Sequence, residues 1–330
     1  MSNRRRRILG ASIATLAMPG VLFPAISSAQ PAKLTRLIVG FPAGGGTDVA
    51  ARALADRMQA SYPAGLIVES RPGASGRLAV EYVKSSPPDG TTMLFTTDFV
   101  LTIFPHSFKK LNYDPIKDFV PVAVCANTSL AFCIGPSVPE NVKTVADFVA
   151  WSKANPKEAA YASTSAGATP HFAGLMFSRA AGIPLLHVPY KGGAPALQDL
   201  MGGQIASSFN PVGEIIPQLK SGKIRVLATT GAKRNKFLPD VPTMVESGFK
   251  DVVAEVWLGV LMPANTPQAI VSRAASTIND ALKSPELRET YSKFGMDPLG
   301  GTPESFAALI KSDLAQWGPV IKASGFTAEE

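Results

Sequence analysis

The stretch LIVGFPAGGGTD (residues 37–48) joins an apolar strand pattern to a glycine-rich turn and to the start of a helix. Gly44, Gly45 and Gly46 let the backbone turn sharply and approach another molecule closely, because glycine has no Cβ. The helix that Thr47 opens begins with N–H groups that have no partner inside the helix. This order predicts a site for a small anion, although a plain strand-to-helix turn has the same pattern.

Strand and helix patterns alternate beyond this turn. Strands expected at 37–41, 66–69 and 92–96 are separated by helices expected at 49–61 and 77–84. Such alternation predicts a parallel sheet with right-handed crossover connections. Ligands of such sheets bind at the carboxyl ends of the strands.

The pattern restarts after Pro121, which predicts a second α/β lobe. The mature chain of about 300 residues also exceeds what one hydrophobic core commonly holds. The remaining expected strands are 122–126, 132–134, 161–163, 185–188, 206–209, 226–229 and 255–261, and the remaining helices are 145–154, 170–180, 194–201, 214–221, 267–283, 285–294 and 303–323.

The two cysteines fall in neighbouring apolar runs. Runs at 120–126 and 130–134 flank the polar residues 127–129, which predicts a hairpin. An oxidising compartment would then permit a cross-strand disulfide between Cys125 and Cys133. Two buried free thiols are the alternative, and we favour them.

Residues 1–29 have the composition of an export signal. Four arginines at 4–7 precede a mildly apolar stretch, and Ser27-Ser28-Ala29 suits a cleavage site. The paired arginines favour a twin-arginine signal over a general secretory one. The signal predicts export, and no later stretch is long and apolar enough to cross a bilayer, so we expect the mature chain to be soluble.

Composition gives little support to nucleic-acid, metal or nucleotide chemistry. The arginines at 4–7 supply four of the seven net positive charges, which leaves +3, and the other basic residues are scattered. There is no C-x-x-C pattern and no close spacing of histidines, so we expect no metal. The first turn lacks the G-x-G-x-x-G spacing, so we expect no dinucleotide cofactor.

Two later turns repeat the strand, turn and helix order. In STSAGAT (163–169), Thr169 suits an N-cap and Pro170 suits the first helical position. The turn VPYKGGAP (188–195) places Lys191 beside two glycines. Each turn fits either an anion-binding wall or a capped surface turn, and the residues alone leave both interpretations open.

Six ordered motifs resemble the Bug/TctC family, the periplasmic solute receptors of tripartite tricarboxylate transporters. They extend over essentially the whole mature chain. The motifs are FPAGGGTD (41–48), VESRPGASG (68–76), PDGT (88–91), YDPIKDF (113–119), HVPYKGGAP (187–195) and LPDVPT (238–243).

The resemblance implies a two-lobed α/β fold of the periplasmic-binding-protein type II (Venus flytrap), with a mostly parallel sheet in each lobe. It implies one lobe from 30–127 and 253–330 and another from 128–252, after a signal peptide at 1–29. A small organic carboxylate would bind between the lobes, gripped by main-chain amides and two ordered waters. Membrane transporter subunits would be the partner, and we expect a monomer without nucleic-acid partners.

The candidate ligand-binding residues come from matching positions of both lobes. The Ser/Gly/Thr turn would form the wall opposite the first glycine turn, and Thr97 and Asp98 end the third strand at the crevice. The full set is Pro42, Ala43, Gly44, Gly45, Gly46, Thr47, Asp48, Thr97, Asp98, Ser163, Ser165, Ala168, Thr169, His171 and Asn210.

Two positions depart from the family pattern. Asn210 stands where the family often has an aspartate, which removes a carboxylate that can recognise an amino group and favours a plain mono- or dicarboxylate, including an aromatic one. Thr96-Thr97-Asp98 replaces Gly-Thr-Asn, and Asp98 would repel a second carboxylate unless it is hydrogen-bonded away.

A secreted α/β serine hydrolase is the alternative function. STSAG (163–167) comes close to a nucleophile elbow, with Ser165 as the nucleophile. No acidic residue occurs from Ala166 to His187, the last histidine, so the usual order of Ser, acid and His is not available. A triad in another order stays open.

Overall fold

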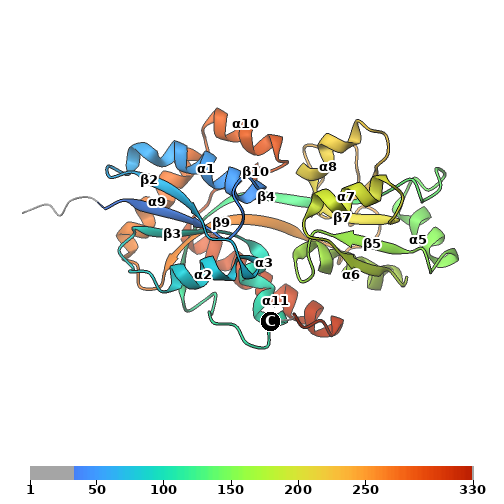
Figure 1. Cartoon of the computed structure of the whole chain (residues 1–330), viewed down its shortest axis with the longest axis horizontal. Helices are drawn as coiled ribbons and strands as arrows, with labels where there is room; N and C mark the ends of the chain where they lie inside the picture. Colours follow the sequence, from blue (N-terminus) through green and yellow to red (C-terminus); the bar gives the residue numbers. More distant parts are fainter. Residues whose placement is uncertain (1–32, 329–330) are drawn as a thin grey trace, which may run out of the picture. The chain divides into compact units, whose positions relative to one another are not determined.

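Two long antiparallel strands, β4 (Phe119–Ile134) and β9 (Glu255–Pro263), run between the two lobes of the structure (Figure 1). The computed structural model describes residues 33–328. The first part of β4, up to Ser129, pairs with β9, whereas residues from Leu130 onward pair with strands of the second sheet. One strand therefore belongs to both sheets.

The first sheet contains β1 (Thr35–Val39), which lies between β2 (Leu66–Ser70) and β3 (Thr92–Thr97) with parallel pairing. β9 joins β3 to β4 with antiparallel pairing, and β10 (Asp297–Pro298) pairs with β4. The larger helices of this part are α1 (Gly46–Met58), α2 (Arg77–Lys84), α9 (Gln268–Ala281), α10 (Pro285–Lys293) and α11 (Pro303–Ser324).

The second sheet has β5 (Ala160–Ser163) between β6 (Leu186–Pro189) and β7 (Ser207–Pro211), again in parallel. β7 and β8 (Arg225–Thr229) pair antiparallel with β4. The helices here are α5 (Val145–Ala154), α6 (Thr169–Ala181), α7 (Gly193–Met201) and α8 (Val212–Leu219).

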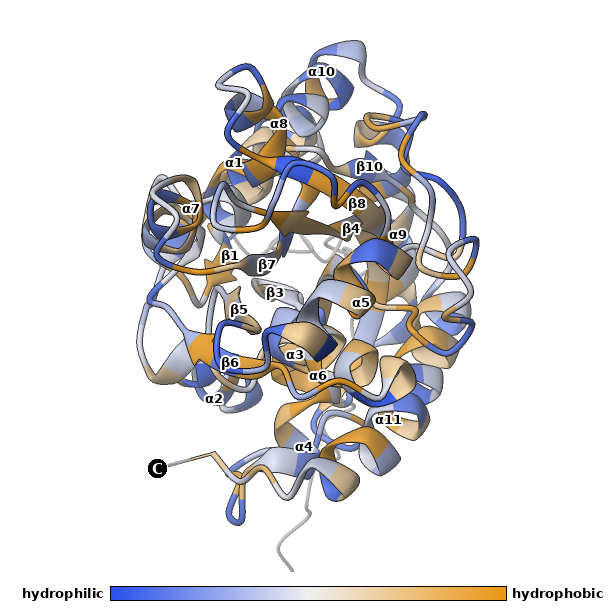
Figure 2. Ribbon diagram, turned by 90° about the vertical axis from the view of Figure 1, so that its right-hand side faces the viewer, coloured by the Kyte–Doolittle hydropathy of each residue, from blue (hydrophilic) through white to orange (hydrophobic). Residues whose placement is uncertain are grey.

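The predicted two-lobed α/β fold is confirmed. Parallel strands alternate with helices in both sheets, and the antiparallel members are β4, β8, β9 and β10. The helix α11 carries both hydrophobic and hydrophilic residues (Figure 2). Its Phe306, Ile310 and Trp317 are buried in the core, as expected for a helix that covers a sheet with one face.

Two short helices that follow β3 were not predicted from the sequence. α3 (Asp98–Thr102) and α4 (Phe104–Ser107) are too short to show a helical period in the sequence. Both pack against the C-terminal helix α11. α3 carries Asp98 and Phe99 at the carboxyl end of β3.

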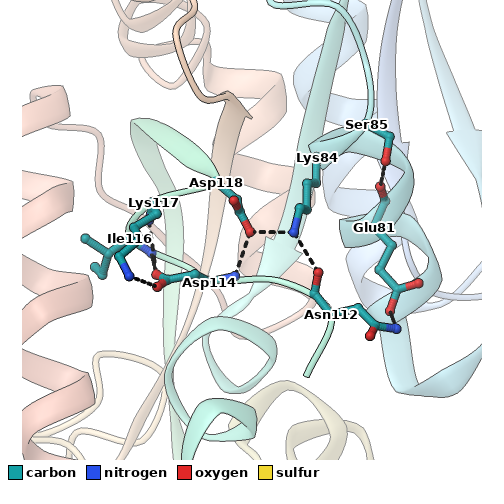
Figure 3. Close-up of polar contacts among 8 residues, drawn as sticks. All are labelled: Glu81, Lys84, Ser85, Asn112, Asp114, Ile116, Lys117 and Asp118. Atoms are coloured by element: carbon teal, nitrogen blue, oxygen red, sulfur yellow. Dashed lines mark hydrogen bonds and ion pairs between the residues drawn. The ribbon is translucent and has the colours of Figure 1, made fainter. Parts of the chain in front are cut away.

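The motif YDPIKDF lies in the segment between α4 and β4 and is tied to α2 by polar contacts (Figure 3). Lys84 of α2 reaches the carboxylate of Asp118 at 2.9 Å and the carbonyl oxygen of Asn112 at 2.7 Å. The Asp118 carboxylate also accepts the Asp114 N–H. Because these contacts fix the loop before Phe119, they fix where β4 begins.

The predicted hairpin about residues 127–129 is wrong. Asn127, Thr128 and Ser129 continue β4 and pair with the start of β9, so their polar side chains do not mark a turn. Cys125 and Cys133 are free and fully buried. They are eight positions apart along an extended strand, which separates them by roughly 26 Å, whereas a disulfide requires Cα atoms within about 7 Å.

We expect two free thiols per chain. Protein unfolded in guanidinium without reductant should release two equivalents in an Ellman assay, whereas the native protein should react slowly because both side chains are buried. A reductant should leave the melting temperature unchanged. Fewer than two thiols, or a melting temperature that falls on reduction, would contradict the continuous strand.

Candidate functional site

A cavity of about 880 Å³ lies where the carboxyl ends of strands from both sheets meet, a size typical of small-molecule sites. Residues after β1 and β3 form one side, and residues after β5, β6 and β7 form the other. Its lining residues are Phe41, Pro42, Gly46, Thr47, Ser75, Thr97, Phe99, Ala126, Asn127, Thr128, Thr164, Ser165, Ala168, Pro170, Tyr190, Lys191, Gly192, Gly193, Pro211, Gly213, Glu214, Val256, Leu258, Phe294 and Met296.

Only part of the first glycine turn, residues 42–48, lines the cavity. Pro42, Gly46 and Thr47 line the cavity, whereas Ala43, Gly44, Gly45 and Asp48 do not. The Gly44 N–H donates to the Asp48 carboxylate at 2.9 Å, and the Gly45 N–H donates to the Pro42 carbonyl oxygen. The amides of these two glycines are thus already used. The Gly46 and Thr47 N–H groups, at the start of α1, make no hydrogen bond to the residues described.

Asp48 anchors the turn from behind. Burial opposes its ionisation, but hydrogen bonds from Arg52, the Gly44 N–H and Ser70 outweigh burial and hold the pKa of Asp48 below its usual value. The residue is therefore an ionised structural anchor. Its place behind the turn explains why an acidic side chain can stand beside a predicted anion site.

Thr97 and Asp98 lie at the end of β3, as predicted, but they have different surroundings. Thr97 lines the cavity, and its buried hydroxyl has no partner among the described residues. Asp98 is fully buried behind it, where one carboxyl oxygen accepts the Thr169 hydroxyl at 2.5 Å. The hydrogen-bonded alternative for Asp98 is thus the one observed.

Burial also changes the charge of Asp98. It raises the pKa of this carboxyl to about 8, against the lowering effect of the Thr169 hydrogen bond. Asp98 is then mostly neutral at pH 7, so its repulsion of a nearby anion is weak.

The second turn shows the same division between wall and support. Ser165 and Ala168 line the cavity, whereas Ser163, Thr169 and His171 lie outside it. The buried Ser163 hydroxyl lies 2.7 Å from the His187 ring, and the His171 ring accepts the Gly167 N–H. Ser163, Thr169 and His171 therefore support the turn from outside the cavity, and Ser165 lies on its cavity side.

The rings of His171 and His187 stack on each other with their centroids 3.8 Å apart. Burial lowers the pKa of His171 to about 4, and burial together with His171 lowers the pKa of His187 to about 3. Both rings are therefore neutral at physiological pH. A neutral stacked pair supports the turn without adding charge to the cavity.

Ser165 lacks the surroundings of a hydrolase nucleophile. Its hydroxyl donates to the Ala166 carbonyl oxygen, and within residues 33–328 no histidine hydrogen-bonds it. The Ser163 hydroxyl does meet a histidine, but Ser163 is fully buried. The geometry gives no support to a serine hydrolase that uses Ser165.

Several wall residues were not predicted from the sequence. Asn210 is fully buried and points its amide at Glu214, which lines the cavity in its place. Phe41 and Phe99 add aromatic rings that lie edge to face. The one available signal for Glu214 was its place four residues after Asn210, at the start of a predicted helix, where i and i+4 side chains meet.

Residues 50–326 match the model of the tripartite tricarboxylate transporter family receptor, TctC. The chain belongs to this family. The resemblance inferred from the six motifs is thereby confirmed, and TctC receptors are periplasmic solute-binding proteins.

Individual relatives resemble this chain in sequence or structure over nearly their full length. BugT of Bordetella pertussis is 30% identical over 319 residues, 96% of each chain. A Rhodopseudomonas palustris protein solved with adipate superposes with a TM-score of 0.80 at 32% identity, covering 90% of this chain and 99% of that one. MatC of the same species, solved with bound malate, gives 0.75 at 26% identity, covering 88% and 100%.

Stability should depend on the protonation of Asp98. Because its folded-state pKa lies above the unfolded value, the acid costs no stability below about pH 4 and progressively more as the pH rises towards 8. Asp98→Asn keeps an oxygen for the Thr169 hydroxyl but cannot ionise. Its stability relative to wild type should increase with pH, by up to about 1.4 kcal/mol per pH unit.

Thermal unfolding of ligand-free protein between pH 4 and 9 measures this effect. Asp251→Asn, at an exposed acid, is the matched control and should follow wild type at every pH. Parallel curves for wild type and Asp98→Asn would show that Asp98 ionises normally.

Proposed function

We propose that this chain is a periplasmic receptor that binds a small organic carboxylate in the cavity of about 880 Å³ and delivers it to a tripartite tricarboxylate-type transporter. The observation that carries this proposal is the cavity wall itself. It combines the N–H groups of Gly46 and Thr47 with the unpartnered, buried hydroxyl of Thr97. These groups can donate hydrogen bonds to an anion, and the acidic side chains behind them, Asp48 and Asp98, are hydrogen-bonded to other residues.

The second wall supplies donors of the same kind. Thr164 contributes a hydroxyl group, and the Ser165 hydroxyl could join it by turning away from the Ala166 carbonyl oxygen. Ala168 precedes the first turn of α6. A carboxylate bound between the walls would contact both at once. Since such contacts require both walls together, ligand binding favours the closed arrangement by its differential affinity for it.

The rest of the wall fits a ligand with an apolar body. Phe41, Phe99, Leu258 and Met296 line the cavity beside the polar turns. Apolar lining with a few placed polar groups is typical of small-molecule sites. Adipate and malate in two relatives support a carboxylate as the ligand class for this chain.

Lobe boundaries and partner follow the same proposal. We retain 30–127 with 253–330 as one lobe and 128–252 as the other. The change of β4 from β9 to β7 and β8 near Ser129 supports this division. Membership of a transporter receptor family supports membrane subunits as the partner. The proposed signal peptide, 1–29, lies outside the described residues, and no described helix could span a membrane.

A panel of acids should contain a ligand that stabilises the protein. Refolded protein, freed of co-purified ligand, is heated with adipate, malate, succinate, citrate, benzoate or phenylacetate. A ligand at about 100 times its Kd should add roughly 2.7 kcal/mol to the free energy of unfolding. Folded protein that responds to no acid would contradict the proposal.

Thr97→Val should weaken binding of the acid identified. The substitution keeps the size of the side chain but removes the hydroxyl, and we expect roughly a tenfold higher Kd because a charge-assisted hydrogen bond is lost. Thr35→Val, at the far end of β1, is the matched control. Equal affinities measured by calorimetry would remove Thr97 from the ligand site.

A further inference from the structure

The cavity contains one acidic and one basic side chain among the residues described, Glu214 and Lys191. Both belong to the second wall, and both keep accessible surface. Neither takes part in an ion pair within residues 33–328. An unpaired carboxylate in a cavity proposed to hold an anion needs an explanation.

Glu214 is held in place by a chain of hydrogen bonds. The Asn210 amide NH₂ donates to Glu214 Oε2 at 2.9 Å, and the Ser208 hydroxyl donates to the Asn210 amide oxygen. Ser208 and Asn210 are both fully buried on β7. The amide cannot turn its oxygen towards the carboxylate without repulsion, so the donor orientation is fixed.

Gly193 provides the space for this arrangement. A Cβ at position 193 would overlap the Glu214 carboxylate and approach the Asn210 amide nitrogen to 2.9 Å. The absence of a side chain at the start of α7 thus lets the carboxylate lie against the backbone at the cavity wall. The hydrogen bond from Asn210 and the space beside Gly193 thus position a carboxylate that is otherwise exposed.

The remaining acceptor capacity of this carboxylate is open to a ligand. A carboxylate can accept about four hydrogen bonds, and Glu214 receives one from the described residues. Loss of solvation raises the pKa of Glu214, against the lowering effect of the Asn210 hydrogen bond. The ionised form would therefore gain from a further donor.

We propose that Glu214 selects carboxylate ligands that carry a second group able to donate a hydrogen bond, a hydroxyl or an ammonium group, with Asn210 as its positioning residue. This inference rests on the proposed function of the cavity. A ligand without a donor would leave Glu214 facing an anion or an apolar group, which costs free energy. This proposal differs from the expectation drawn from Asn210, which is that a plain carboxylate is favoured.

Matched ligand series test the inference by calorimetry. Each series contains a parent acid with its hydroxy and amino derivatives: succinate, malate and aspartate; glutarate, 2-hydroxyglutarate and glutamate; benzoate, 4-hydroxybenzoate and 4-(aminomethyl)benzoate. Wild type should bind a derivative at least about tenfold more tightly than its parent, the effect of a hydrogen bond to a charged group. Preference for the hydroxy or the amino member identifies the donor.

Glu214→Gln should abolish this preference. Asn210 would hold the glutamine oxygen, so the glutamine NH₂, a donor, would face the cavity instead of an acceptor. Gly193→Ala and Asn210→Leu should have the same effect on selectivity, because each displaces the carboxylate without removing its charge. Affinity for the parent acid should stay equal or increase in all three variants. Glu158→Gln, at an exposed acid of the same lobe, should match wild type.

The outcomes separate this inference from the proposed function. Parent acids that bind wild type as tightly as their derivatives, or a preference that survives in Glu214→Gln, would overturn the role of Glu214 and leave the receptor function intact. Folded wild type that binds no acid of any series would overturn the proposed function and this inference with it.

Discussion

The antiparallel pairing of β4 with β9 is the constraint on which the rest of the structure depends. Its register spans residues from Phe119 to Ser129 and shifts twice, between Pro121 and Ala123 and between Val124 and Ala126. Such bulges increase the local twist of a strand pair. The same β4 backbone then enters the second sheet. Both walls of the cavity are therefore attached to one strand pair, so a change in their separation must bend these strands or the segments beside them.

The first glycine turn and the end of β3 keep their donors apart from acidic charge, through hydrogen bonds at Asp48 and through burial at Asp98. Asp48 is ionised but its oxygens are used by Arg52, Ser70 and the turn. Asp98 is hydrogen-bonded to Thr169 and is neutralised by burial. The turns can thus present N–H and hydroxyl groups to an anion although acidic residues stand directly behind them. A site of this kind needs no arginine, since preorganised neutral donors replace one.

Sequence patterns predicted the elements where local signals agree. α6 was expected at 170–180 and spans Thr169–Ala181, because Pro170 suits the first turn and Gly182 ends the helix in a left-handed conformation. The sequence patterns gave a wrong prediction at 127–129, where polar residues resemble a turn but pair with β9. Partners of a strand come from distant sequence, which local patterns do not contain. For the same reason the sequence located the turns of the site but not which residues of each turn reach the cavity.

The position of the negative charge in the cavity shows why a family motif does not settle selectivity. Motif comparison places Asn210 at a position where a carboxylate is common, and a neutral amide there suggests that the charge is lost. Asn210 is instead the donor that orients Glu214, one helical turn further along. The buried position thus determines the orientation of a carboxylate that the neighbouring residue supplies, and Gly193 leaves room for it. The place of the negative charge in this cavity therefore depends on Asn210, Gly193 and Glu214 together, which lie on β7, α7 and α8. The effect of a substitution at one of these positions depends on the residues at the other two.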